Sequence, residues 1–444
     1  MKRRRNPGGG EGLRPPSWAV NAPNTDAVAR KGLDLAAGLA GHCCMAAFPD
    51  VADPALYRSD SWRPLFERMR REDPVHYHPD SLYGPYWSVS RYADIMTVEL
   101  DHGAYSSASE LGGIQIADQP KGQELPNFIR MDPPRHTAQR KTVTPIVAPS
   151  NLANMEGLIR ERTAAVLAGL PRGEVFDWVD RVSTELTAMM LATLFDFPQA
   201  DRRKLTYWSD VAIANTAAED AVVKSEAERM AELRQMADIM AVLWKERAAQ
   251  PPTFDLISMM AHGEATRAMP LNEFIGNLGL LIVGGNDTTR NSMTGGLIAA
   301  LLNPGEIDKV RADRSLLPSL VSEIIRWQTP VIHMRRTATR DIELAGKAIG
   351  KGDKVVMWYV SGNRDEAAID DSEAFRVGRP RARHHLSFGA GIHRCVGDRL
   401  AELQLKILWE EMLARDLRID IVGPPVRLYS NFIRGIRSLP VTLQ

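Results

Sequence analysis

The sequence predicts a mainly α-helical protein with a minor β region. Long segments repeat apolar residues with the helical period, namely 151–170, 180–195, 224–250 and 272–303. Shorter alternating pieces, interrupted by Gly and Pro, predict a few strands. No internal repeat or long linker divides the chain after its N-terminal part. We therefore expect one large domain over residues 51–444, preceded by a partly disordered tail over residues 1–50.

The predicted elements follow one another in a mixed order. Residues 76–100 carry short strand-like pieces such as WSVS, and the helical segments 151–170, 180–195 and 224–250 come next. Pro304 ends the long helix predicted over residues 272–303, because proline cannot continue the helical hydrogen bonding. Residues 342–360 are strand-like, and residues 399–413 form an amphipathic helical pattern.

Composition excludes several classes of protein. The 444 residues have a formal net charge of zero, which argues against a general binder of nucleic acid or of anionic membranes. The apolar stretch 36–48 is too short to span a bilayer and contains His42. Cys43, Cys44 and Cys395 cannot form a disulfide framework. We expect free thiols, no secretory signal, no membrane anchor and a cytoplasmic location.

One loop concentrates the chemistry. Residues 388–397, FGAGIHRCVG, place Cys395 among glycines and directly before the helix predicted over 399–413. A thiolate near a helix N-terminus is stabilised by the helix dipole, and the neighbouring basic residues add positive charge. Gly391 and Gly397 would let a flat ligand approach the main chain. A lone cysteine is usually a small buried hydrophobe, so the case for an iron porphyrin depends on the whole loop.

The loop resembles the cysteine-loop signature of the cytochrome P-450 haem-thiolate monooxygenases at Phe388, Gly391, His393, Cys395 and Gly397. The resemblance implies the cytochrome P-450 fold, with haem b (iron protoporphyrin IX) between a long distal helix and the proximal cysteine loop and helix. It also implies that Cys395 is the axial ligand of the haem iron, and that Phe388, Gly391 and His393 contact the cofactor.

The long predicted helix contains GGNDTTRNS at residues 284–292, a polar interruption in an apolar segment. By itself such a stretch predicts a kink, with hydroxyl groups bonded back to helix carbonyls. Residues 284–292 resemble the oxygen-binding groove of the cytochrome P-450 family, where an acid–alcohol pair delivers protons. The resemblance assigns that catalytic pair to Asp287 and Thr288, and leaves space for oxygen and substrate at Gly284 and Gly285.

Two further groups fit the family pattern. Haem propionates need cationic donors, and the family order indicates His136, Arg140, Arg336 and His393, with Arg336 preferred over its neighbour Arg335.

Glu323 and Arg326 resemble the family's Glu-x-x-Arg element and receive a structural role. Their third partner is Arg376 or Arg379, and the sequence leaves both open.

The resemblance implies insertion of one oxygen atom from O2 into a C–H bond, since cysteinate ligation favours O–O cleavage. The sequence has no dinucleotide-binding glycine motif after a strand and no cysteine cluster for an iron–sulfur centre. Electrons are therefore expected from NAD(P)H through a ferredoxin reductase and a separate ferredoxin. A basic docking patch for the ferredoxin is expected from Arg135, Arg140, Lys141, Arg394 and Arg399.

The residues around both motifs resemble those of a soluble bacterial branch of the family, whose members hydroxylate medium-chain alkanes and fatty acids at the terminal carbon. An apolar substrate wall is expected from Leu278, Leu281, Ile282, Val331 and Ile332. One alternative is the same chemistry on a terpene or other bulky secondary metabolite, and another is a non-catalytic haem sensor or carrier. A peroxide-driven enzyme is disfavoured because the acid–alcohol pair is intact.

Overall fold

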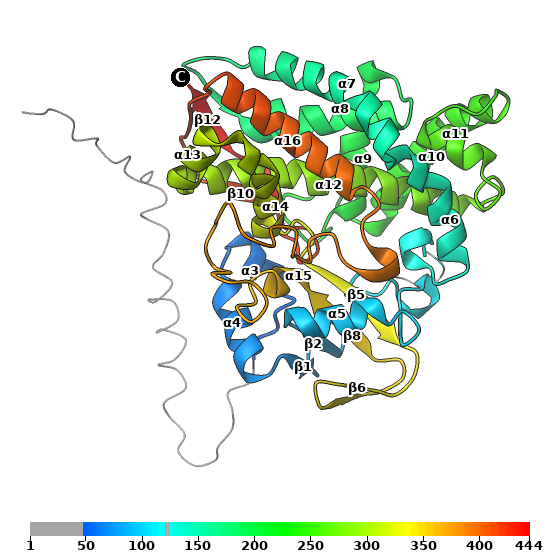
Figure 1. Ribbon diagram of the computed structural model, residues 1–444. Coiled ribbons are helices and arrows are strands. Elements are labelled where there is room, and N and C mark those ends of the chain that lie inside the picture. Colours follow the sequence, from blue (N-terminus) through cyan, green and yellow to red (C-terminus); the bar gives the residue numbers. More distant parts are fainter. Residues whose placement is uncertain (1–47, 120–121, 123) are drawn as a thin grey trace, which may run out of the picture.

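The computed structural model describes residues 48–444, except 120, 121 and 123. Nearly all of the predicted N-terminal tail, with Cys43 and Cys44, lies outside the described residues. Figure 1 shows most helices gathered in one part of the molecule, with the main sheet and the shorter N-terminal helices in the other. The fold is mainly α-helical with small sheets, which confirms the predicted fold class.

The helices hold many more residues than the strands, and none of those described is both long and apolar enough to cross a bilayer. Their bounds are α3 Pro54–Arg58, α4 Arg63–Glu72, α5 Tyr92–Leu100, α6 Arg135–Val143, α7 Pro149–Ala168, α8 Glu185–Leu194, α9 Arg203–Ile213, α10 Glu226–Ala248, α11 Leu256–His262, α12 Leu271–Leu302, α13 Pro304–Ala312, α14 Leu317–Gln328, α15 Tyr359–Gly362 and α16 Asp398–Ala414.

The long helices match their sequence periods closely. Segments 151–170, 224–250 and 272–303 correspond to α7, α10 and α12, and 399–413 lies within α16. Segment 180–195 is less regular, since a wide π turn over Val179–Thr184 precedes α8. Within residues 76–100 the strands end at Val89, and the remainder forms α5, whose inward-facing apolar residues pack on the sheet.

The main sheet has the strand order β1-β2-β8-β5-β3, in which β2 and β8 are parallel and the other pairs antiparallel. Three smaller sheets are β4-β12-β9, β10-β11 and β6-β7. The strand bounds are β1 Val75–His78, β2 Tyr86–Val89, β3 Tyr105–Ser106, β4 Val175–Asp177, β5 His333–Ala338, β6 Ile342–Leu344, β7 Lys347–Ile349, β8 Lys354–Trp358, β9 Ile419–Ile421, β10 Val426–Arg427, β11 Ile436–Ser438 and β12 Pro440–Leu443.

Helix α12 runs through the middle of the helical part (Figure 1). It is apolar around most of its circumference, as expected of a helix enclosed by others. Glycines bring neighbours close: a Cβ at Gly285 would lie 2.7 Å from Leu191 of α8, and one at Gly296 would lie 2.8 Å from Ile324 of α14. These contacts hold α12 rigidly between its neighbours and keep it continuous through the polar segment.

Candidate active site

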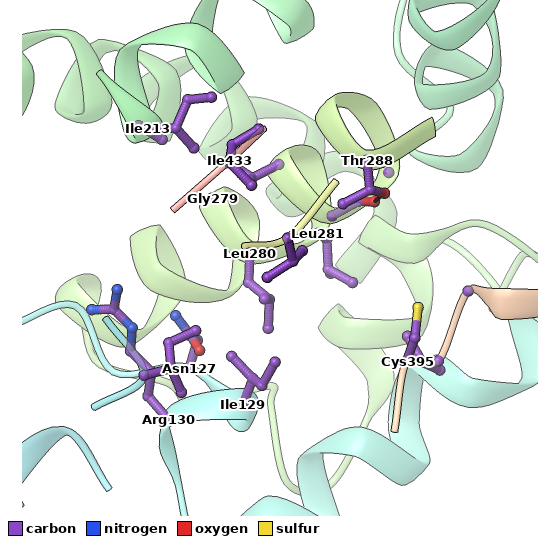
Figure 2. A pocket seen from close by; sticks show the side chains of 18 of the residues that line it. Asn127, Ile129, Arg130, Ile213, Gly279, Leu280, Leu281, Thr288, Cys395 and Ile433 are labelled. Atoms are coloured by element: carbon purple, nitrogen blue, oxygen red, sulfur yellow. Dashed lines mark hydrogen bonds between the residues drawn. The ribbon is translucent and has the colours of Figure 1, made fainter. Parts of the chain in front are cut away.

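A cavity of about 460 Å³ lies between α12 and the loop that carries Cys395. This is within the range of roughly 300–1,000 Å³ typical of small-molecule sites. One wall is formed by α12 from Ile275 to Ser292, and the opposite wall by the loop and the start of α16. Figure 2 shows Cys395 on one side of the cavity and Thr288 of α12 facing the same space.

The cysteine loop is shaped by backbone hydrogen bonds. Cys395 N–H donates to the Phe388 carbonyl at 2.8 Å, which closes the loop on itself. Gly389 and Gly391 both have positive φ, at 65° and 62°. A Cβ at Gly391 would lie 2.4 Å from the carbonyl oxygen of Glu99 on α5. The loop is therefore pinned between its own turn and α5, which places the sulfur at the cavity wall.

Gly391 does not line the cavity, and its contact with the cofactor stays a prediction. Its positive φ and its close approach to Glu99 explain why glycine stands there. Phe388 and Gly397 do line the cavity. At Gly397 a Cβ would meet nothing within 4 Å, so glycine here leaves space beside the sulfur.

The sulfur of Cys395 is exposed to the cavity while lying deep within the protein. Burial raises the pKa of the Cys395 thiol to about 11, against the smaller opposing effects of the Gly397 N–H, Arg140 and Arg394. The helix start and the nearby arginines therefore do not create a thiolate by themselves, contrary to the expectation from sequence. Formation of a thiolate here requires a stronger cation, and a metal ion that binds the sulfur supplies one.

Within the described part of the chain, no group of three His, Cys, Asp or Glu side chains could hold a metal ion. Gly397 and Gly284 both line the cavity and leave open space in it, which suits a porphyrin.

Polar groups near the sulfur fit the carboxylates of such a group. Arg140 and Arg336 line the cavity, and no carboxylate of the described residues pairs with Arg140. The two rings of His136 and His393 lie 4.4 Å apart, and three of their four nitrogens are buried without a hydrogen-bond partner among the described residues. Unsatisfied buried donors next to a cavity indicate that a ligand with acceptor oxygens belongs there.

The two histidines act as neutral donors. Burial, with the charges of Arg336, His136 and Arg140, lowers the pKa of His393 to about 2. Burial also lowers the pKa of His136, which does not itself line the cavity and lies behind His393. The positive charge expected from His393 is therefore absent at neutral pH, and arginines carry the charge.

The choice between neighbouring arginines follows from strand alternation. Arg336 of β5 faces the cavity, where its Nη2 donates to Glu99 at 3.1 Å. Arg335 faces the opposite side of the strand and pairs with Asp118. The placement agrees with the prediction for Arg336. Its partner Glu99, which also accepts from the Tyr359 hydroxyl, was not foreseen from the sequence.

On the α12 side, Gly284, Gly285 and Thr288 line the cavity. The Thr288 hydroxyl donates to the Gly284 carbonyl at 3.0 Å, which leaves its oxygen free to accept from the cavity side. A Cβ at Gly284 would meet nothing within 4 Å, so this glycine keeps the space beside Thr288 open.

Asp287 faces away from the cavity and is fully buried. Its carboxylate accepts from Ser209 of α9 at 2.5 Å and pairs with Arg290, which also bonds Asp210 at 2.8 Å. Burial raises the pKa of Asp287 to about 6; Arg290 opposes this shift, whereas Asp210 adds to it. Arg290 and Asp210 line a second cavity on the far side, so the carboxyl lies between the two spaces.

Glu323 and Arg326 of α14 form a fully buried ion pair at 2.7 Å. Of the two candidate third partners, Arg379 bonds Glu323 through its side chain at 3.1 Å. Arg376 offers only its backbone N–H to Glu323, while its side chain pairs with Asp371.

The predicted substrate wall is partly wrong. Leu281 and Val331 line the cavity, whereas Leu278, Ile282 and Ile332 do not. Leu278 and Ile282 lie on the side of α12 that packs into the hydrophobic core, and Ile332 is buried on the reverse side of its extended segment. Counting back from Thr288 in steps of four would have found Gly284 and Leu280, which share its helix face.

Other residues that line the cavity could not be assigned to it from the sequence, because they come from segments distant in the chain. These are, among others, Asn127, Ile129, Arg130, Ile213, Met230 and Ile433.

The basic residues predicted to dock a ferredoxin are only partly available. Arg140 lines the cavity, so it does not belong to a surface patch. Arg135 pairs with Glu273 at 2.8 Å, and Arg394 with Asp398 at 3.0 Å. Lys141 and Arg399 are exposed, and neither forms an ion pair among the described residues.

Comparison with known proteins agrees with this geometry. The sequence model of the family "Cytochrome P450" matches residues 85–416. The linalool 8-monooxygenase of Pseudomonas putida is 36% identical over 89% of this chain and 98% of its own length. The methyl-branched lipid omega-hydroxylase of Mycobacterium bovis is 31% identical over 88% of this chain and 95% of its own length. The solved structure of cytochrome P450-153 from Novosphingobium aromaticivorans has a TM-score of 0.84 and 48% identity, covering 89% of this chain and 99% of that one.

Proposed function

The chain belongs to the cytochrome P450 family of haem monooxygenases, and from this premise we propose that it hydroxylates the terminal carbon of medium-chain alkanes or fatty acids. The observation that carries the proposal is the cavity itself. It joins Cys395 to Thr288 and continues as a mostly apolar space lined by aliphatic side chains.

We propose that the haem is held by Cys395 at the iron and by Arg140, Arg336, His136 and His393 at the propionates. These residues fit, because the sulfur faces the cavity and the buried histidine nitrogens lack other partners. When bound, the haem supplies reductive activation of O2 and insertion of one oxygen atom into a C–H bond.

The chain's own residues manage protons and water around that chemistry. Thr288 presents a hydroxyl oxygen at the cavity, and Asp287 lies one residue earlier with its carboxyl turned towards Ser209 and Arg290. With a pKa of about 6, Asp287 exchanges protons readily near neutral pH. We propose that protons reach the cavity from the side of Asp210 by way of Asp287 and Thr288.

Terminal attack requires that only the chain end reach the haem face that points to α12, because primary C–H bonds are stronger than secondary ones. Leu280, Leu281 and Ile433 line the cavity on the side away from Cys395 and narrow the space for a substrate (Figure 2). The relative named methyl-branched lipid omega-hydroxylase supports a terminal site on an aliphatic chain.

A second candidate substrate is a small terpenoid. The relative named linalool 8-monooxygenase favours it, at 36% identity over most of both chains.

Substrate-induced spectral titration separates the two candidates. Alkanes and fatty acids of increasing length are titrated beside linalool, and the oxidation products are identified by gas chromatography with mass spectrometry. The proposal requires tight binding of linear chains and a terminal alcohol as the main product. Binding of the terpenoid alone, or purely subterminal alcohols, would overturn it.

We propose that a ferredoxin, reduced by NAD(P)H through its reductase, delivers the electrons near Lys141 and Arg399. Both are exposed and lie on the side of the cysteine loop. Reversing both charges (K141E with R399E) should raise the apparent KM for ferredoxin several-fold. Reversal at Lys309 of α13 is the control. Unchanged kinetics in the double variant would contradict this docking site.

A further inference from the structure

Arginines that line the cavity differ in how their charge is balanced. Arg336 pairs with Glu99, and Arg229 of α10 pairs with Glu226. Arg140 lies against the cysteine loop, where its guanidinium donates to the Arg394 carbonyl at 2.5 Å. Arg130 has no carboxylate partner among the described residues.

Arg130 is a buried cation that one neighbouring side chain positions. Its Nη2 donates to Gln115 at 2.9 Å, the one hydrogen bond that the described residues give its guanidinium. Burial lowers the pKa of Arg130 to about 10, so it stays charged at neutral pH. An uncompensated charge in an apolar cavity is costly, which implies that an anion completes the site.

The segment around Arg130 is fixed against α12 far from the sulfur. Phe128 N–H donates to the Asn277 side chain at 3.2 Å, and Gly276 allows the carbonyl of Pro126 to approach closely. Asn277 lies eleven residues before Thr288, about 16 Å along the helix axis at 1.5 Å per residue.

Arg130 is also distinct from the groups assigned to the haem propionates. Arg140 donates to the Arg394 carbonyl in the cysteine loop and Arg336 to Glu99, whereas Arg130 donates to Gln115. Burial alone perturbs Arg130. Figure 2 shows Arg130 beside Asn127 on one side of the cavity and Cys395 on the other, with Ile129, Leu280 and Leu281 between them in this view.

The arrangement is a cation at one end of a cavity, a thiol at the other, and aliphatic side chains between. We propose that Arg130 binds the carboxylate of a fatty acid whose hydrocarbon chain runs along α12 towards Thr288, on the α12 side of the haem. The guanidinium fork suits a carboxylate, and Gln115 orients it. A single arginine matches a singly charged acid better than a phosphate. This inference rests on the proposed function and narrows it from aliphatic chains in general to acids.

Anchoring one end determines which carbon reaches the iron. A carboxylate at Arg130 holds the chain by its head, so the methyl end is the part presented beside Thr288, at the haem face opposite Cys395. The spacing of Asn277 and Thr288, about 16 Å along α12, matches an extended chain of roughly twelve to fourteen carbons at about 1.3 Å of advance per C–C bond. Alkanes would bind in the same space without a fixed register.

The test compares an acid with its uncharged analogue in matched variants. Dodecanoic acid and methyl dodecanoate are titrated spectrally into the haem-loaded wild type, R130Q, R130K and R229Q. R229Q is the control, since Glu226 already balances that charge. We expect R130Q to weaken acid binding about tenfold to a hundredfold and ester binding less than about twofold, while R130K restores part of the acid affinity. R229Q should leave the acid-to-ester ratio of dissociation constants close to that of the wild type.

Three outcomes would overturn the inference. Equal weakening of acid and ester in R130Q would mean that Arg130 only shapes the cavity. Loss of haem, measured as cofactor bound per protein before any substrate is added, would mean that Arg130 holds a propionate. If the wild type binds dodecanoic acid no more tightly than its methyl ester, Arg130 does not anchor the carboxylate. If alkanes are still hydroxylated at the terminal carbon in the last case, the proposed function survives and only the anchor fails.

Discussion

Removing the Ser209 hydroxyl should raise the pH at which the proposed proton delivery by Asp287 is lost. Ser209 donates to Asp287 at 2.5 Å and stabilises its ionised form. A hydrogen bond to a charged group contributes about 1.5–3 kcal/mol, and one pKa unit corresponds to about 1.4 kcal/mol. S209A should therefore raise the pKa of Asp287 from about 6 to roughly 7–8.

The sign follows from the role of Asp287 as a proton donor, which acts only in its protonated form. In the wild type, coupled turnover should fall as the pH rises through about 6. At pH 7 roughly a tenth of the Asp287 side chains are protonated in the wild type, against about half or more in S209A. Where proton delivery limits the rate, turnover at pH 7 should rise by about fivefold.

The assay measures product formed per NAD(P)H consumed, with saturating ferredoxin and reductase, from about pH 5.5 to 8.5. The rate of haem reduction is measured separately at each pH, so that titration of the electron donors is subtracted. S183A is the matched control, because Ser183 makes a buried hydrogen bond to Thr294 of α12 and none to Asp287. If the pH profile of coupled turnover is the same in S209A as in the wild type, or shifts to lower pH, the role of Asp287 is refuted.

Three further predictions concern the loop, the core and α12. C395S should abolish the red-shifted Soret band of the reduced, carbon monoxide-bound protein, and retention of that band would exclude thiolate ligation by Cys395. R326M, which removes the cation of the fully buried pair with Glu323, should lower the free energy of unfolding by about 3–5 kcal/mol; a loss below about 1 kcal/mol in urea denaturation would contradict a structural role. G285A should destabilise by about 1–3 kcal/mol because its Cβ meets α8 at 2.7 Å. G284A should fold at least as stably as the wild type but narrow the cavity, so equal melting temperatures for the two variants would contradict this distinction.

Motifs confined to one short segment could be assigned from the sequence. The loop around Cys395 and the polar segment of α12 are each continuous in the chain, and their helices were predicted from period alone. The preference for Arg336 over Arg335 also agrees with the structure, in which only Arg336 faces the cavity.

Predictions failed where a residue's direction depended on distant neighbours. Leu278 and Ile282 lie within one turn of Leu281, but the core that receives them comes from other helices. Position 391 requires glycine because its backbone lies against Glu99, almost three hundred residues earlier in the chain. The thiol of Cys395 and the ring of His393 have pKa values shifted by burial, which local sequence does not reveal.

The sequence by itself determined the family, the helical class, the sulfur at Cys395 and the two polar motifs that face each other across the cavity. Hydrophobic period is enough for the helical class. The family, the sulfur and the polar motifs follow from the resemblance of short continuous segments to the family's pattern. The tertiary structure alone decided that Asp287 turns away from the cavity towards Arg290, that Arg379 completes the buried pair, and that Arg130 stands unpaired opposite Cys395. Burial and charge balance are sums over all neighbours in space, and those neighbours meet only when the chain has folded.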